Sequence, residues 1–301
     1  MNVFNNIMNI KHLVISGGGP SMLQSLGALH YLSTNSFLHL NNIKTIYGTS
    51  AGALVGTLIC LKYDWETVND YIIKRPWKDV FKINIDTIFE SYKKKGLFDT
   101  KTVEKCLKPL FDAKDLSLDI TFEEFYKYSN IELHMFAFDI NEFKLQDISY
   151  LTYPKLPLIK GIQMTCGLPI LVTPVCVEDK CFIDGGLISN YPLKYCIDAG
   201  NNPDEILGLK NQYDTNTKFS NHIDQKSTML DYLITLFFKI IHSLSTKLEI
   251  PYIKNEVICN SSLLTVNYLK ESLNSVDIRK NLFDNGSESA KLFISKLENG
   301  V

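Results

Sequence analysis

The chain has 301 residues, of which 45% are hydrophobic and 21% charged, and its 31 basic and 33 acidic residues give a formal net charge of −2. This is the composition of a globular protein with a substantial core, and it excludes a collagen, a coiled coil or a long disordered tail. Because binding to nucleic-acid phosphates depends on clustered lysine and arginine, the near-neutral charge also argues against a nucleic-acid partner.

Cysteine usage and the N-terminus bear on where the protein acts. Seven cysteines are scattered without a C-x-x-C pair, so neither a disulfide framework nor a zinc site is expected, and free thiols in a reducing cytosol are the simplest interpretation. Cys176 and Cys181 flank a predicted hairpin and are the pair of most interest. We find no signal peptide in residues 1–10 and no spanning helix, and expect an intracellular protein, cytoplasmic or peripherally bound to a membrane.

The first part of the chain alternates strand-like and helix-like segments. Residues 12–16 predict a short apolar strand that ends at a run of glycines, and residues 22–32 carry apolar side chains at helical spacing. Residues 42–47 predict a second strand and residues 51–63 a second helix. Two successive units of strand, glycine turn and helix favour a parallel sheet covered by helices.

The later elements are less regular. We predict helical and loop material over residues 65–119, with a helix at 101–110 capped by Asp99 or Thr100, and strands at 133–140 and 172–183, the second broken by a turn at 178–180. Residues 201–227 are polar and rich in turn formers, which predicts a long surface loop.

Residues 229–241 form the chain's longest largely apolar segment. Asp231, Thr235 and Lys239 recur every fourth residue within it, so they lie along one narrow polar stripe of a helix. This pattern favours a mostly buried core helix. The alternative is a helix that lies on a membrane surface or covers a site.

A G-x-S-x-G motif lies between the second predicted strand and the second predicted helix, in the sequence G-T-S-A-G at residues 48–52. This is the context of a nucleophile elbow, in which a sharp turn exposes a serine at a helix N-terminus. Ser50 is therefore the candidate nucleophile. The turn requires small residues at positions 48 and 52, which Gly48 and Gly52 provide, because a larger side chain there would collide with the neighbouring strand or helix. The alternative is a tight turn with an idle serine.

Gly17, Gly18 and Gly19 follow the first strand. They do not fit a nucleotide-binding loop, because the G-x-G-x-x-G spacing fails at Met22 and no Gly-Lys-Ser/Thr follows. They provide unhindered backbone N–H groups beside the strand end where Ser50 is expected. That is what an oxyanion hole requires.

A serine nucleophile needs a base. Asp184 ends a short apolar strand in the sequence F-I-D-G-G, although Asp-Gly is also a common hairpin turn. Of the six histidines, His222 and His242 follow Asp184 in the chain, as a Ser…Asp…His order demands. A solvated or structural histidine is the more frequent explanation of both.

Together these motifs resemble the patatin-like phospholipases. The glycine run, the G-T-S-A-G elbow and a D-G-G block followed by Asn190 and Pro192 occur in the family's order and sheet context, over residues 11–195. The resemblance implies a three-layer α/β/α sandwich with a mostly parallel central sheet. It also implies a serine/aspartate dyad without histidine, and neither a metal nor another cofactor.

The resemblance assigns roles to individual residues. Ser50 is the nucleophile, Asp184 is the base, and the backbone N–H groups of Gly17, Gly18 and Gly19 form the oxyanion hole.

One departure concerns the loop itself. The family usually follows its glycine run with one variable residue, then Arg or Lys, then glycine, whereas Pro20 is followed here by Ser21 and Met22. The missing cation raises the question of how the loop is held, or how a lipid phosphate is met.

We expect residues 1–301 to form a single catalytic domain, with a motif-bearing core at about 11–200 and a C-terminal loop and helical extension at 201–301. The expected function is hydrolysis of fatty-acyl esters of glycerophospholipids or related acyl lipids, of phospholipase A type, through an acyl-enzyme. Acyl transfer by the same dyad and an inert lipid-binding protein are the alternatives.

An acyl lipid and a membrane surface are the expected partners. Acyl chains need an apolar trough, and the candidates to line it are residues 229–241 together with Phe81, Phe89 and Phe98. Core packing explains these side chains equally well. Membrane contact is expected first at residues 229–241.

Overall fold

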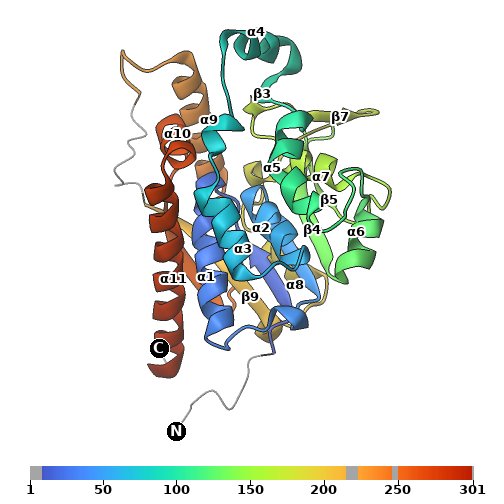
Figure 1. The fold of residues 1–301 in the computed structure, drawn as a ribbon, viewed down its shortest axis with the longest axis vertical. Coiled ribbons are helices and arrows are strands. Elements are labelled where there is room, and N and C mark those ends of the chain that lie inside the picture. The colour runs from blue at the N-terminus through green and yellow to red at the C-terminus, as the bar shows by residue number, and fades with distance from the viewer. Residues whose placement is uncertain (1–8, 215–222, 246–249, 300–301) are drawn as a thin grey trace.

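The computed structural model describes residues 9–214, 223–245 and 250–299 (Figure 1). One sheet of eight strands forms its centre. The strands of this sheet are β1 (His12–Ile15), β2 (Thr45–Thr49), β4 (Glu132–Asp139), β5 (Lys144–Ile148), β7 (Val175–Val177), β8 (Lys180–Asp184), β9 (Ile206–Asp214) and β10 (Glu256–Ser262). A separate pair consists of β3 (Gly96–Phe98) and β6 (Ile170–Val172).

The central sheet is mostly parallel. Its order is β10-β9-β1-β2-β4-β8-β7, and β5 also pairs with β4. The strands from β10 to β4 run parallel, whereas β5, β7 and β8 pair in the antiparallel sense. The carboxyl ends of β1 and β2 therefore meet at one edge of the sheet, which is where parallel α/β folds place their sites.

Helices cover both faces of the sheet. They are α1 (Met22–Thr34), α2 (Ala51–Cys60), α3 (Trp65–Asn69), α4 (Ile85–Lys94), α5 (Thr100–Asp112), α6 (Phe122–Ser129), α7 (Leu158–Thr165), α8 (Leu193–Asp198), α9 (Met229–Ser245), α10 (Val266–Asn274) and α11 (Val276–Asn299). Shorter helical turns include η2 (Gly19–Ser21), η4 (Asp70–Lys74), η5 (Trp77–Asp79) and η6 (Gly185–Leu187).

Alternate residues of the buried strands pack on opposite faces. Leu13 and Ile15 join a large core with side chains of α1, α2 and α11, whereas Val14 and Tyr47 join a smaller core with Leu193 of α8. Every residue of β1 and β2 is buried, as expected of parallel strands covered on both sides. This arrangement confirms the three-layer α/β/α fold with a mostly parallel sheet.

Most elements up to residue 140 lie where they were predicted. The first two strands and helices, β1, α1, β2 and α2, follow one another as expected. Helix α5 begins after Asp99, which is its N-cap, and β4 corresponds to the strand predicted at 133–140. The predicted strand at 172–183 is wrong in part. Its first residue belongs to β6, and the β7–β8 hairpin begins at Val175, because Pro174 between them cannot donate to a strand ladder.

The predicted loop at residues 201–227 is wrong over its first half. Residues 206–214 form β9, which lies between β1 and β10, and Ile206, Leu207 and Leu209 are fully buried there. The polar residues that suggested a loop occupy the far end of the same strand. The segment 201–301 therefore contributes two strands to the central sheet, and is not only a loop and helical extension.

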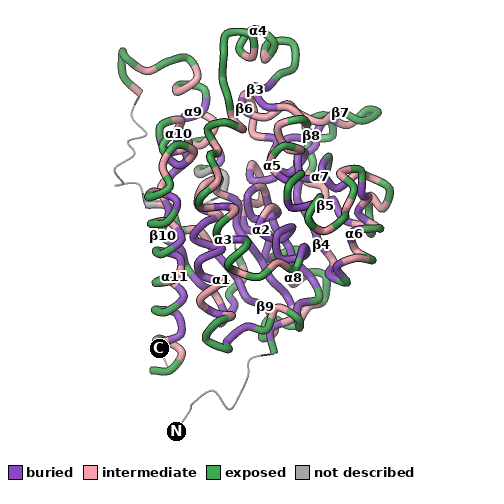
Figure 2. The backbone as a smooth tube through the Cα atoms, in the orientation of Figure 1, coloured by how far each residue is buried: buried purple, intermediate pink, exposed green. Residues whose placement is uncertain are grey.

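The expectation of a mostly buried helix at residues 229–241 is also wrong. Ile234, Thr235 and Ile241 of α9 are buried. Exposed apolar side chains are Met229, Tyr232, Leu233, Leu236 and Ile240. One face of α9 thus lies open to solvent at the same end of the molecule as α4 (Figures 1 and 2).

Cys176 and Cys181 lie opposite each other in the β7–β8 hairpin, and a disulfide joins them. The expectation of free thiols is therefore wrong for this pair, because the register places both side chains on one face; the other five cysteines are free. No helix within the described ranges is both long enough and apolar enough to cross a bilayer.

Candidate active site

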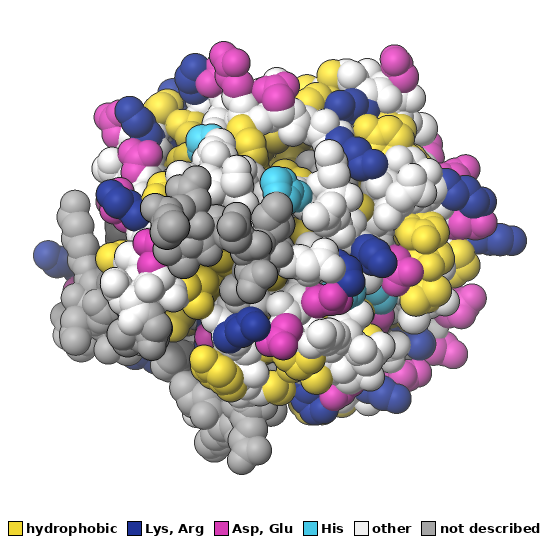
Figure 3. All heavy atoms as spheres, turned by 90° about the horizontal axis from the view of Figure 1, so that it is seen from below, with side chains coloured by type: hydrophobic (Ala, Val, Ile, Leu, Met, Phe, Trp, Pro, Cys, Tyr) yellow, Lys and Arg dark blue, Asp and Glu magenta, His cyan; other side chains and the backbone are white. Residues whose placement is uncertain are grey.

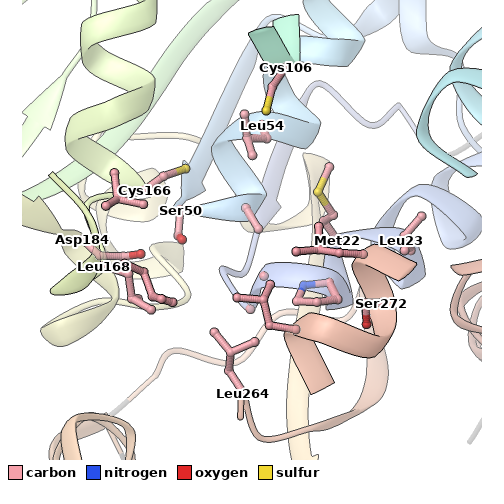
Figure 4. A pocket seen from close by; sticks show the side chains of 18 of the residues that line it. Met22, Leu23, Ser50, Leu54, Cys106, Cys166, Leu168, Asp184, Leu264 and Ser272 are labelled. Atoms are coloured by element: carbon pink, nitrogen blue, oxygen red, sulfur yellow. The ribbon is translucent and has the colours of Figure 1, made fainter. Parts of the chain in front are cut away.

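Ser50 lies at the turn between β2 and α2. Its φ is 54°, a strained backbone conformation for a residue with a side chain. A Cβ added at Gly48 would lie 2.7 Å from the Ala53 nitrogen, and one at Gly52 would collide with the Ile15 carbonyl oxygen. Both positions therefore require glycine, and the sharp turn directs the Ser50 side chain into a cavity (Figure 4).

Thr165 at the end of α7 holds this turn in place. Its hydroxyl oxygen accepts the Ser50 N–H at 2.9 Å and donates to the Phe136 carbonyl on β4 at 2.6 Å. Thr165 was not predicted as a site residue, because nothing near it in the chain shows that it reaches the elbow.

Asp184 lies at the end of β8, and its side chain points toward the same space as that of Ser50 (Figure 4). The residue is 2% exposed, and its Oδ1 accepts the Gly186 N–H at 2.8 Å. Burial raises the pKa of Asp184 to about 6, while hydrogen bonds from Ser50 and Gly186 favour the ionised form. At neutral pH the carboxylate is mostly ionised, yet it is a stronger base than an exposed aspartate.

The glycine run adopts a conformation that separates its three amides. The Gly17 N–H donates to the Asn190 carbonyl at 2.9 Å, which removes it from the predicted set of free donors. Within the described part of the chain, no backbone hydrogen bond engages the N–H of Gly18 or Gly19, and both residues line the cavity beside Ser50. Of the three amides predicted to form an oxyanion hole, those of Gly18 and Gly19 therefore stay candidates.

Three neutral side chains hold the loop in the absence of the family's cation. The Gly17 carbonyl accepts hydrogen bonds from Asn190 Nδ2 at 3.1 Å, Asn211 Nδ2 at 2.8 Å and the Tyr213 hydroxyl at 3.2 Å. Gly18 has φ 155°, and a Cβ there would lie 2.7 Å from Asn211 Nδ2. Asn211 and Tyr213 escaped the sequence analysis because they lie on β9, which was predicted as loop.

Cys166 is a further neighbour of Ser50 that the sequence analysis did not assign to the site (Figure 4). Its thiol is hydrogen-bonded with Ser50, and burial together with the nearby Asp184 charge raises its pKa well above the usual value. The thiol therefore stays protonated at neutral pH. Because the thiolate is the reactive form, Cys166 is not a candidate nucleophile at neutral pH.

Ser50 and Asp184 open onto a cavity of about 300 Å³. Apart from a few polar groups near these two residues and at the far wall, its lining is apolar and includes Phe81 and Phe98, as expected. Phe89 does not line it: this side chain lies on the exposed face of α4.

The lining also bears on the question of a histidine. Among the described residues, none that lines the cavity is a histidine. His222 lies outside the described residues, and so does the side chain of His242 in α9. The expected dyad without histidine therefore stays a proposal.

Known proteins resemble this chain over the part that contains the glycine run, the Ser50 elbow and Asp184. Residues 13–197 match the family model described as patatin-like phospholipase. The chain is 28% identical over 189 residues to "Probable lipid hydrolase 463L" of Invertebrate iridescent virus 6, an alignment that covers 62% of this chain and 63% of that protein, which is less than two thirds of its length. It is 24% identical over 299 residues to an uncharacterized protein of Acanthamoeba polyphaga mimivirus, covering 96% and 95% of the two chains.

A solved structure shares the fold. The crystal structure of VipD from Legionella pneumophila superposes with a TM-score of 0.56 at 17% identity, over 96% of this chain and 67% of that one. The family model covers more than half of the residues, and it includes both Ser50 and Asp184. The chain belongs to the patatin-like phospholipase family.

Proposed function

We propose that the protein hydrolyses fatty-acyl ester bonds of glycerophospholipids or related acyl lipids, with Ser50 as the nucleophile and Asp184 as the general base. One observation carries this proposal. A serine on a strained elbow and a buried carboxylate with a raised pKa open together onto one largely apolar cavity. The name of the iridescent virus relative, a lipid hydrolase, supports the same class of activity.

The reaction proceeds in two halves. Asp184 accepts the proton of the Ser50 hydroxyl as its oxygen attacks the ester carbonyl, and the N–H groups of Gly18 and Gly19 bind the tetrahedral oxyanion. Such a donor contributes about 3 kcal/mol of transition-state stabilisation. The carbon–oxygen bond to the leaving group then breaks, and Asp184 returns the proton to the departing alcohol or lysolipid. Asp184 next deprotonates a water molecule, whose oxygen attacks the acyl-serine carbonyl. As the ester bond to Ser50 breaks, Asp184 returns this proton to the serine oxygen and the fatty acid leaves.

The cavity supports an acyl chain as the group that is transferred to Ser50. Its volume of about 300 Å³ lies at the lower end of the range for small-molecule sites, about 300–1,000 Å³. Leu54, Leu58 and Leu107 are among the apolar side chains that line it. Within the described residues, Asp184 is the one carboxylate on its wall, so an apolar chain meets no second acid there.

Product analysis with phosphatidylcholine vesicles tests this function. We expect free fatty acid and lysolipid from the native protein, and a loss of about a thousandfold or more in turnover for Ser50→Ala, because the acyl acceptor is gone. The same assay with added lysolipid or alcohol separates hydrolysis from acyl transfer, since transfer yields a new ester. Full turnover by Ser50→Ala would contradict the proposal.

A further inference from the structure

Helix α4 projects from the body of the protein beyond the β3–β6 pair (Figure 1). Ile85, Ile88, Phe89 and Tyr92 follow one another at the spacing i, i+3, i+4, i+7, which places them on one face of the helix. These side chains are 71%, 54%, 74% and 91% exposed. A helix that turns its aromatic and branched side chains to water is unusual, and it indicates a binding surface.

This exposed face belongs to a well-formed helix. The Asn84 side chain accepts the Thr87 N–H at 2.8 Å, and the Thr87 hydroxyl accepts the Asn84 N–H at 2.8 Å, which completes a capping box. At the other end, Lys95 adopts the left-handed conformation that ends a helix. The helix is therefore stabilised by its own ends, and its apolar face is free to meet a partner.

The chain on both sides of α4 forms part of the cavity wall. Trp77 and Phe81 precede the helix, Phe98 follows it, and all three line the cavity. The rings of Phe81 and Phe98 contact each other edge to face, with centroids 5.1 Å apart. The segments that precede and follow α4 in the chain therefore both reach the wall of the cavity that contains Ser50.

Basic side chains flank the apolar face. Lys78, Lys93 and Lys95 are exposed, and none of the described carboxylates lies within ion-pair distance of them. Lys82 and Lys94 do pair with acidic neighbours. Asp86 in the first turn of α4 is the one exposed carboxylate of residues 78–95 without such a pair, so three unpaired lysines stand against one acid. The segment therefore presents an excess of unpaired positive charge beside exposed aromatic side chains, a combination that suits the surface of a bilayer with anionic lipids.

We propose that α4 is a membrane-docking helix, which inserts Ile85, Ile88, Phe89 and Tyr92 into the headgroup region of an anionic lipid bilayer. Docking in this way would bring the rim of the cavity to the lipid surface, so that an acyl chain can enter without crossing water. The choice of a bilayer as partner rests on the proposed lipid hydrolase function. The same unpaired lysines disfavour a second copy of the chain, because two basic segments repel each other.

The opposite end of the molecule has a different character. Figure 3 shows that end, where basic and acidic side chains are interspersed and apolar ones appear in small groups. A bilayer therefore meets a suitable surface at the α4 end. The unpaired Lys93 and Lys95 at the C-terminal end of α4 explain why anionic lipid should strengthen the contact.

Vesicle sedimentation of the Ser50→Ala protein tests the proposal without lipid turnover. We expect binding to phosphatidylcholine vesicles that contain phosphatidylserine. Binding should be roughly tenfold weaker after an added Phe89→Ser, because one aromatic side chain no longer inserts into the bilayer. Neutralising Lys93 and Lys95 with glutamine should weaken binding to these vesicles by roughly tenfold and have little effect with phosphatidylcholine alone.

A matched control and a separate activity assay keep the outcomes distinct. Phe143 on the β4–β5 turn is 75% exposed, and Phe143→Ser should leave vesicle binding unchanged. Hydrolysis of a water-soluble short-chain ester by the protein with an intact Ser50 should also be unchanged by Phe89→Ser. Equal binding by the Phe89→Ser and parent proteins, an equal loss in Phe143→Ser, or a change of oligomeric state in place of vesicle binding would overturn the proposal. If the protein does not hydrolyse the soluble ester, the proposed enzyme function is contradicted instead. The vesicle-binding results then still decide whether α4 docks on a membrane.

Discussion

The carboxyl group of Asp184 is the titrating group on which the proposed reaction depends. Its pKa is raised to about 6, chiefly by burial, and the reaction requires the ionised form. Ser50 and Cys166 lie beside it, but the thiol of Cys166 stays protonated across the working range because burial raises its pKa. One ionisation should therefore control the acid side of the rate profile.

The pH dependence follows from this pKa. We expect kcat/KM for a soluble ester to be half-maximal near pH 6 and to fall about tenfold per pH unit below it, because protonated Asp184 cannot accept the Ser50 proton. Initial rates measured from pH 4.5 to 8 in buffers of constant ionic strength test this. A profile that is flat through pH 5 would show that another group serves as the base.

Asp184→Asn should separate activity from stability. The folded pKa of about 6 lies above the ordinary value of 3.8, so the ionised carboxylate costs stability above pH 6, and this cost disappears as the pH falls below about 4. Asparagine is neutral at every pH and keeps an oxygen for the Gly186 N–H. We expect the variant to be inactive yet more stable by ~1–3 kcal/mol at pH 7.5 in urea unfolding, with no gain near pH 4. A loss of stability at pH 7.5 would contradict the cost assigned to burial.

At the scale of elements, β9 connects the C-terminal part of the fold to the glycine loop. Asn211 and Tyr213 on this strand bind the Gly17 carbonyl, and Ser261 on β10 donates to Asn211 Oδ1 at 3.2 Å. Hydrogen bonds between neutral groups thus hold the glycine loop in a chain that has Ser21 where the family usually has Arg or Lys. These residues position the loop through its Gly17 carbonyl.

Removing one of these hydrogen bonds should lower turnover without abolishing it. We expect Asn211→Ala to reduce kcat for a soluble ester by about tenfold with little change in KM, because the Gly18 and Gly19 amides lose orientation toward the transition state more than toward the substrate. Asn202→Ala is the control: this exposed side chain accepts the Asp204 N–H at the short helical turn before β9, does not contact the glycine loop, and its loss should leave kcat unchanged. An unchanged kcat in Asn211→Ala would show that the glycine loop keeps its conformation without this hydrogen bond.

The sequence predicted the parts of this fold that are encoded locally. The strand, glycine turn and helix units at Gly17 and Ser50 depend on neighbouring residues, so spacing alone located them. β9 was missed because its polar half resembles a loop, and its pairing with β1 is a tertiary contact. The apolar periodicity of α4 is visible in the sequence, but whether such a face meets the core or water depends on how the helix packs.

At the scale of the whole molecule, Arg279 joins the C-terminal helices to the wall of the cavity. Its guanidinium is buried and donates to the carbonyls of Ser272 at 2.7 Å, Leu273 at 3.0 Å, Ile73 at 2.7 Å and Arg75 at 3.1 Å. These carbonyls lie at the ends of α10 and η4, where helices leave acceptors unpaired. The Arg279 side chain therefore links its own helix, α11, to the ends of α10 and η4 at the wall of the cavity.

Arg279→Met should destabilise the fold. Four carbonyls lose a charged donor while the apolar stem is kept, and we expect a loss of ~3 kcal/mol or more in the free energy of unfolding. Lys280→Met, at the next and exposed position of α11, is the control and should change stability by less than ~0.5 kcal/mol. Equal stability of the two variants in urea unfolding would show that the carbonyls find other partners.

The most direct test of the proposed dyad is covalent labelling of the native protein with a fluorophosphonate, followed by peptide mass spectrometry. We expect one adduct on Ser50 at pH 7.5, a much slower reaction in Asp184→Asn, and none at that peptide in Ser50→Ala, because the label requires a serine whose proton is taken by a base. Labelling of a different residue, or an equal rate at Ser50 with and without the Asp184 carboxylate, would contradict the central claim.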